Sequence, residues 1–149
     1  MSNDEKVTKR LISVLEDGSK GFTDAAEHLT KSSEPQLAAT FGRYADQRAT
    51  FAAELSTLAA EYGDNIHESG SVAGALHRGW INIKDALTGS SPEAVLGAAR
   101  TGENHTVEEF DEALAEDLSP TLKAIIVRQA DAVQAARDTV ASLKLAADQ

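Results

Sequence analysis

The chain has 149 residues and no cysteine, and its 24 acidic and 14 basic side chains give a net charge of −10. This length suits one domain that buries its own apolar core, and a hydrophobic content of 42% excludes a disordered chain. The negative charge, which no basic stripe interrupts, excludes nucleic acid and anionic membrane surfaces as partners. The absence of cysteine excludes disulfide, thiolate and iron–sulfur chemistry.

Apolar residues recur at helical spacing along five segments, so we predict a single all-α domain over residues 1–149. The first helix spans about residues 4–30. No acidic side chain shares its apolar face, because Asp17 and Asp24 lie well off the centre of that face and Glu27 lies about 160° from it. We therefore expect this helix to offer the interior only small and apolar groups.

The second helix, over about residues 34–62, follows a short polar break. Ser33 or Glu34 is its expected N-cap, and Pro35 occupies its first turn. The short break makes the first two helices antiparallel neighbours. Arg48 falls within about 20° of the apolar centre of this helix, so its side chain is predicted to point inward.

A shorter helix over about residues 72–87 follows a polar loop. Its apolar stripe includes Trp80, which we expect to anchor this helix to the rest of the molecule, whereas His77 lies on the flank of the stripe. The two side chains, one helical turn apart, also mark a candidate small-molecule pocket between the short helix and the bundle.

The last two helices span about residues 92–117 and 120–147, and a Ser-Pro pair opens each of them. Glu103 lies about 25° from the apolar centre of the first. Gln129 lies in the middle of the apolar stripe of the second. Both side chains are therefore predicted to face the interior.

The order of long and short helices decides the predicted topology. The first two helices form one hairpin and the last two form another, with the shorter helix in the long connection between them. A four-helix bundle with one crossover connection has the connectivity of ferritin-like folds. We therefore predict a ferritin-like bundle of two antiparallel hairpins with an additional short crossover helix.

Three polar side chains are thus expected inside the bundle. We predict a buried ion pair between Arg48 and Glu103, with Gln129 hydrogen-bonded to one of them, because a bare charge in the core would cost several kcal/mol. Two alternatives stay open: a metal or substrate site around Glu103 with Glu54 or His105, and exposure of these side chains to solvent. Otherwise His105 is expected at the surface. A solvated acidic face is expected at Glu108, Glu109, Asp111 and Glu112.

Several stretches are distinctive, above all the crossover segment, where residues 68–80 read ESGSVAGALHRGW and residues 85–89 read DALTG. Further such stretches are Gly21-Phe22, Arg48 to Leu55, Gly102-Glu103 and Arg128-Gln129. Together they resemble a bacterial family of ferritin-like four-helix-bundle proteins catalogued as a domain of unknown function. The resemblance covers nearly the whole chain. It implies a ferritin-like bundle, a small oligomer and a link to stress responses, but no established reaction. It also implies a histidine in the last helix near Arg137, and this arginine removes that ligand.

A di-iron site in a ferritin-like bundle uses a Glu from each of two helices and a Glu-x-x-His pair from each of the other two. The chain contains no Glu-x-x-His. We therefore expect a non-catalytic, stress-associated structural or interaction protein that has no cofactor and associates with itself. The alternative is a metal-binding oxidoreductase or iron-handling protein with an atypical iron or manganese site around Glu103. Because no signal peptide or membrane span is recognisable, we expect a cytoplasmic location.

Overall fold

The computed structural model describes residues 3–61, 79–80, 83–89 and 91–149. Most of these residues belong to the α-helices α1 (Asn3–Lys31), α2 (Pro35–Ala60), α4 (Ile83–Thr88), α5 (Pro92–Leu114) and α6 (Pro120–Ala147). No strand occurs within the described ranges, so the all-α prediction is confirmed. Within the same ranges, no helix is both long and apolar enough to cross a membrane.

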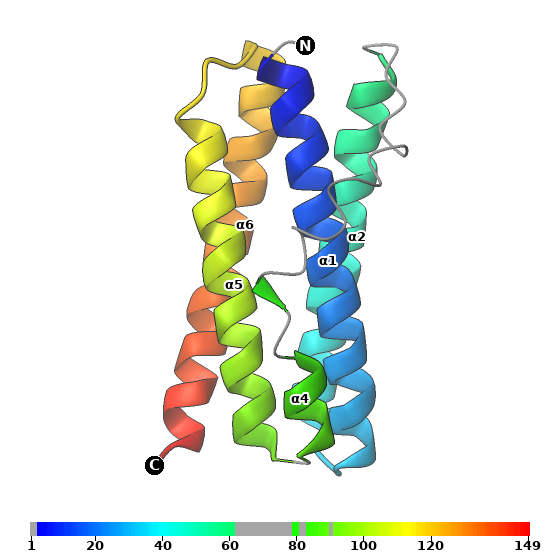
Figure 1. The fold of residues 1–149 in the computed structure, drawn as a ribbon, viewed down its shortest axis with the longest axis vertical. Helices are drawn as coiled ribbons and strands as arrows, with labels where there is room; N and C mark the ends of the chain where they lie inside the picture. The colour runs from blue at the N-terminus through cyan, green and yellow to red at the C-terminus, as the bar shows by residue number, and fades with distance from the viewer. Residues whose placement is uncertain (1–2, 62–78, 81–82, 90) are drawn as a thin grey trace.

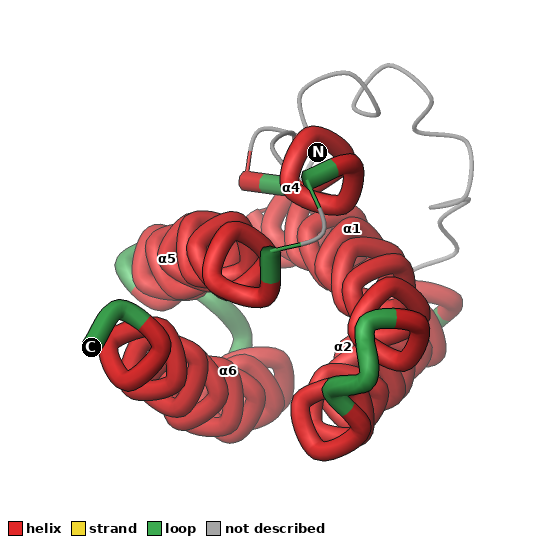
Figure 2. The backbone as a smooth tube through the Cα atoms, turned by 90° about the horizontal axis from the view of Figure 1, so that it is seen from below, coloured by secondary structure: helices red, strands yellow, loops and turns green. Residues whose placement is uncertain are grey.

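The four long helices form two antiparallel hairpins that pack together (Figure 1). One hairpin consists of α1 and α2 and the other of α5 and α6, and between the hairpins α1 lies against α5. The short helix α4 belongs to the connection and packs against α5 and α1 (Figure 2). Because α2 ends at one end of the bundle and α5 begins at the other, the chain crosses the length of the bundle between the hairpins, as predicted.

Three of the long helices begin with a proline, at Pro35, Pro92 and Pro120. Proline suits the first turn because its fixed φ is helical and an N–H at that position would have no partner within the helix. Ser91 caps α5, since its hydroxyl oxygen accepts a hydrogen bond from the backbone N–H of Ala94 at 3.4 Å.

The main chain closes the turn between α1 and α2. Of the two predicted N-caps, Glu34 occupies the position but makes no side-chain capping hydrogen bond. Ser33 has a φ of 61°, in the left-handed region that non-glycine residues adopt at a cost. The N–H of Glu34 donates to the carbonyl of Leu29 at 2.9 Å, and this bond brings the chain back for the second helix.

The fourth predicted helix, over residues 92–117, is shorter in the structure and ends at Leu114. The chain has to reverse direction before Pro120, and the residue before a proline avoids the helical conformation. Residues 115–119 therefore form the turn between α5 and α6, whereas helical periodicity alone placed the boundary three residues later.

The predicted crossover helix over residues 72–87 is found as α4, which begins only at Ile83. Gly79 and Trp80 precede it and belong to no α-helix. The remaining residues of that prediction, 72–78 and 81–82, lie outside the described residues. The structure therefore shows a short helix in the last part of the predicted range, and Gly79 and Trp80 interrupt the continuous helix that the hydrophobic stripe indicated.

Two apolar clusters fill the interior, one toward each end of the bundle. One includes Leu11, Leu55, Phe110 and Ile126, and the other includes Phe22, Phe41, Leu96 and Val140. Arg48 on α2 and Glu103 on α5 are fully buried and belong to neither cluster. Both lie between residues of the two clusters along their helices, so the bundle has a polar layer near its middle.

Candidate functional site: a buried ion pair at the centre of the bundle

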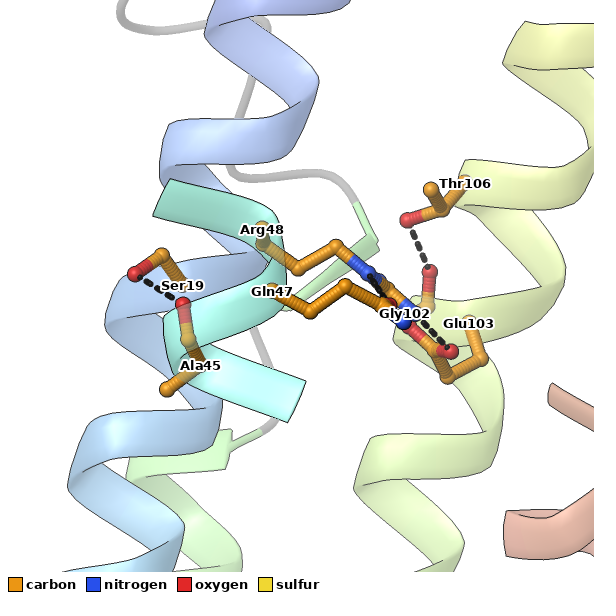
Figure 3. A network of polar contacts seen from close by, with 7 residues as sticks. All are labelled: Ser19, Ala45, Gln47, Arg48, Gly102, Glu103 and Thr106. Atoms are coloured by element: carbon orange, nitrogen blue, oxygen red, sulfur yellow. Dashed lines mark hydrogen bonds and ion pairs between the residues drawn. The ribbon is translucent and has the colours of Figure 1, made fainter. Parts of the chain in front are cut away.

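Arg48 and Glu103 form an ion pair between α2 and α5 (Figure 3). Arg48 Nη1 donates to Glu103 Oε1 at 2.5 Å, and Arg48 Nη2 donates to Glu103 Oε2 at 2.6 Å. Both side chains are 0% exposed. The planar fork of the guanidinium matches the two carboxylate oxygens, which makes such charge-assisted bonds strong and directional. The sequence predicted this contact, and we refer to it as the central ion pair.

Side chains of α1 and α2 position the guanidinium. Arg48 Nε donates to Gln47 Oε1 at 3.2 Å. Its Cζ lies 5.3 Å from the centroid of the Phe22 ring on α1, which is within the range of a cation–π interaction. Near this level the Ser19 hydroxyl of α1 donates to the Ala45 carbonyl of α2 at 2.9 Å, which ties the two helices together. The arginine is thus oriented toward α5 by its own hairpin.

Gln129 is buried as predicted, but its hydrogen bonds go elsewhere. Its Nε2 donates to Glu54 Oε1 at 2.8 Å and to the carbonyl of Phe51 at 3.2 Å. The prediction that Gln129 bonds to Arg48 or Glu103 is therefore wrong. Glu54 follows Arg48 by six residues, or about 9 Å along α2, so Gln129 lies at a different level of the bundle from the central ion pair.

The structure does not bring together the residues of the alternative metal site, Glu103, Glu54 and His105. Glu103 binds the guanidinium of the central ion pair, Glu54 accepts hydrogen bonds from α6, and His105 Nε2 lies 3.8 Å from Glu109 Oε1. In the described part of the chain, no three His, Cys, Asp or Glu side chains are grouped so that they could hold a metal ion. The geometry therefore does not favour this alternative.

Glu109 was predicted on a solvated face, and that prediction is wrong. Its side chain is 7% exposed and accepts hydrogen bonds from Arg10 of α1, from Nη2 at 2.7 Å and from Nε. The hydrogen bond to Glu109 raises the pKa of Arg10 above its ordinary value. The other acids of that face are exposed as expected, namely Glu108, Asp111 and Glu112. Glu109 differs from them because it lies on the side of α5 that faces α1.

Helix α1 carries more polar groups inside than predicted. Thr8, Ser13 and Asp17 are all buried, so the expectation of a purely small and apolar interior face is wrong. The reason is the position of α1, which packs against α2, α5 and α4 and is therefore covered over more than one face. An uninterrupted buried run over residues 11–15 shows the same effect. On α5, His105 was expected at the surface, and its side chain is only partly exposed.

Trp80 lies in a slot formed by glycines of α1 and α5. The residue is 4% exposed, and its ring centroid lies 4.8 Å from that of Phe22. A Cβ atom would lie 2.4 Å from Trp80 Cε3 at Gly21 and 2.3 Å from Trp80 Cε2 at Gly102. Any side chain at either position would displace the ring, so both glycines are needed for this close approach. Trp80 thus anchors the connection between the hairpins to the bundle.

The predicted small-molecule pocket near His77 and Trp80 stays a prediction, because His77 and most of the segment that would line it lie outside the described residues. A hollow of about 370 Å³ occurs at a different place, between the beginning of α1 and the end of α5. Its lining mixes charges of both signs, with Lys6 and Arg10 facing Glu112 and other acids.

Residues 5–116 match the family described as Domain of unknown function (DUF2383). The chain belongs to this family. Among curated proteins, none matches it in sequence. The range that matches the DUF2383 family includes both members of the central ion pair and Trp80, whereas Gln129 and the rest of α6 lie beyond it.

In this DUF2383 chain, α6 contributes no ligand side chain at the middle of the bundle. Its residue buried between the two apolar clusters is Ala136, which is 3% exposed. The next residue, Arg137, turns away from the interior, since its Nη1 donates to Asn104 Oδ1 at 3.3 Å and its Nε to Asp138 Oδ1 at 2.9 Å. Where the family resemblance implied a histidine, this chain therefore has an alanine inside and an arginine near the surface.

Proposed function

We propose that this chain is a non-catalytic structural or interaction protein of ferritin-like fold, which acts in the cytoplasm, associates with itself and serves in a stress response. The observation that carries the non-catalytic part of the proposal is the closed state of the central ion pair. The stress link and the self-association rest on the resemblance of the sequence to its family.

Glu103 is the interior carboxylate best placed for metal or proton chemistry, and both of its oxygens already accept hydrogen bonds from Arg48. A metal ion at Glu103 would either share the carboxylate with the positively charged guanidinium, which repels it, or displace Arg48 by breaking these two bonds. Arg48, which is also 0% exposed, would then remain as a buried charge without its partner. The effective cost of such a charge is several kcal/mol, so the ion pair competes strongly with any metal at this position.

The arrangement of the hairpins supports the ferritin-like part of the proposal, because a bundle with one long crossover is the connectivity of that fold. The side chains near the middle level differ from those of a di-iron bundle. Here α1 has Gly18, α2 has an arginine, α5 has one glutamate and α6 has Ala136. The one carboxylate of α5 is neutralised by the one guanidinium of α2, and their hydrogen bonds join the two hairpins at this level.

Metal content tests the non-catalytic part of the proposal. Untagged protein produced with added iron and manganese should contain well below one metal ion per chain by elemental analysis. It should not accelerate Fe(II) oxidation. Glu103→Gln should give the same background rate as the wild type, and Glu108→Gln, at an exposed position of the same helix, serves as the matched control. One or two ions per chain, with a rate that only Glu103→Gln abolishes, would instead establish the iron-handling alternative.

Light scattering tests the self-association separately. We expect a mass of at least two chains that persists on dilution into the low micromolar range. A mass of one chain at every concentration would contradict self-association and would leave the result on metal content unaffected.

A further inference from the structure

The indole N–H of Trp80 is a buried donor with no hydrogen-bond partner among the residues that the structure describes. Trp80 is 4% exposed, so bulk water cannot accept this bond either. Buried tryptophan N–H groups usually have an acceptor, because an unsatisfied buried donor costs about 1–3 kcal/mol.

A second donor lies close to the same place. The guanidinium of Arg48 has five N–H groups, of which three donate to Gln47 and Glu103. A Cβ atom at Gly18 would lie 3.5 Å from Arg48 Nη1 and 3.8 Å from Trp80 Nε1. Both nitrogens therefore lie within 4 Å of one spot beside Gly18, the position that a Cβ atom would take.

We infer that this spot is a binding site for one buried water molecule, which accepts hydrogen bonds from Trp80 Nε1 and Arg48 Nη1. Water fits because its oxygen accepts two hydrogen bonds and because buried waters typically satisfy polar groups that lack protein partners. An anion fits less well, since Glu103 already neutralises the charge of Arg48. The water links the connection between the hairpins to the central ion pair, so that docking of Trp80 and orientation of Arg48 support each other.

The first test uses the unmodified protein. Trp80 is the single tryptophan of the chain, so an ¹⁵N-labelled sample gives one indole N–H resonance. We expect an NOE cross-peak between this proton and water. Its sign should be that of NOEs within the protein, as for a water molecule that stays bound while the protein tumbles. The absence of any such NOE, in a sample whose other slowly exchanging protons give normal signals, would overturn the inference.

The second test compares two glycine-to-alanine variants in long helices. At Gly42 of α2 no atom lies within 4 Å of the added methyl group, so Gly42→Ala should raise the folding equilibrium constant about fivefold through helix propensity. Gly18→Ala brings only ordinary contact distances of 3.5–3.8 Å, but it takes the space next to the water. We expect it to gain less than Gly42→Ala or to lose stability. A gain equal to that of Gly42→Ala would mean that the spot is dry.

Chloride distinguishes water from a small anion. The indole N–H shift and the stability of the protein should be the same in chloride and in an equal concentration of a larger, non-coordinating anion. A saturable chloride dependence of the indole resonance, lost in Gly18→Ala, would replace the water by an anion and overturn the assignment.

Discussion

Replacing Arg48 by methionine removes the charge of the central ion pair and keeps an unbranched side chain in the core. The carboxylate of Glu103 then stays 0% exposed with both hydrogen-bond donors gone. Removing one partner of a buried pair typically costs about 3–5 kcal/mol, and we expect Arg48→Met to fall in this range. Glu103→Leu should lie at its lower end, because Arg48 keeps its contacts with Gln47 and the Phe22 ring.

The double variant Arg48→Met/Glu103→Leu buries no charge. Replacement of a whole buried pair by apolar side chains is often neutral or stabilising, so we expect it to lie within about 1 kcal/mol of the wild type or above it. The two substitutions are therefore strongly non-additive, with a coupling energy of about 5 kcal/mol or more. Urea unfolding followed by the fluorescence emission of Trp80 measures the free energy of unfolding of the wild type and the three variants. The comparison holds if this free energy falls with urea concentration at the same slope in all four proteins.

The matched control is the ion pair between Arg128 and Glu54, whose side chains are 56% and 34% exposed. Arg128→Met should cost less than about 1 kcal/mol, because exposed pairs contribute little. If Arg48→Met also costs less than about 1 kcal/mol, the guanidinium is solvated and the reasoning from burial fails. If the double variant is as unstable as additivity requires, the two residues do not act as a pair.

Two further substitutions test the surroundings of the site. Gly21→Ala puts a methyl group 2.4 Å from the Trp80 ring. We expect a loss of about 1–3 kcal/mol and red-shifted Trp80 emission; unchanged emission would contradict the slot. Arg10→Gln removes the hydrogen bonds to Glu109 and should cost about 1 kcal/mol, because Arg10 is 60% exposed. Since the folded-state pKa of Arg10 is raised, its contribution is complete below its ordinary pKa and is lost only above the folded value. The urea midpoints of variant and wild type should therefore differ equally at about pH 6 and about pH 9, and a difference that vanishes at about pH 9 would be inconsistent with this pair.

The sequence predicted the features that depend on a single helix. The 3.6-residue period, together with Pro35, Pro92 and Pro120, located the long helices to within a few residues. Their order predicted two hairpins and a crossover. The inward direction of Arg48 and Glu103 followed from the same period, because each lies near the centre of one apolar stripe and a buried charge needs a partner.

Only the packing of several helices decided the rest. Gln129 pairs with Glu54 because side chains meet only at equal heights, and a helical wheel contains no axial coordinate. Glu109 is buried because α1 covers that side of α5, whereas a wheel assigns each helix one apolar face. The slot for Trp80 exists because glycines of two helices, far apart in sequence, come to face the same ring. Periodicity along one helix determines which way a side chain points, and contacts between helices determine what it meets.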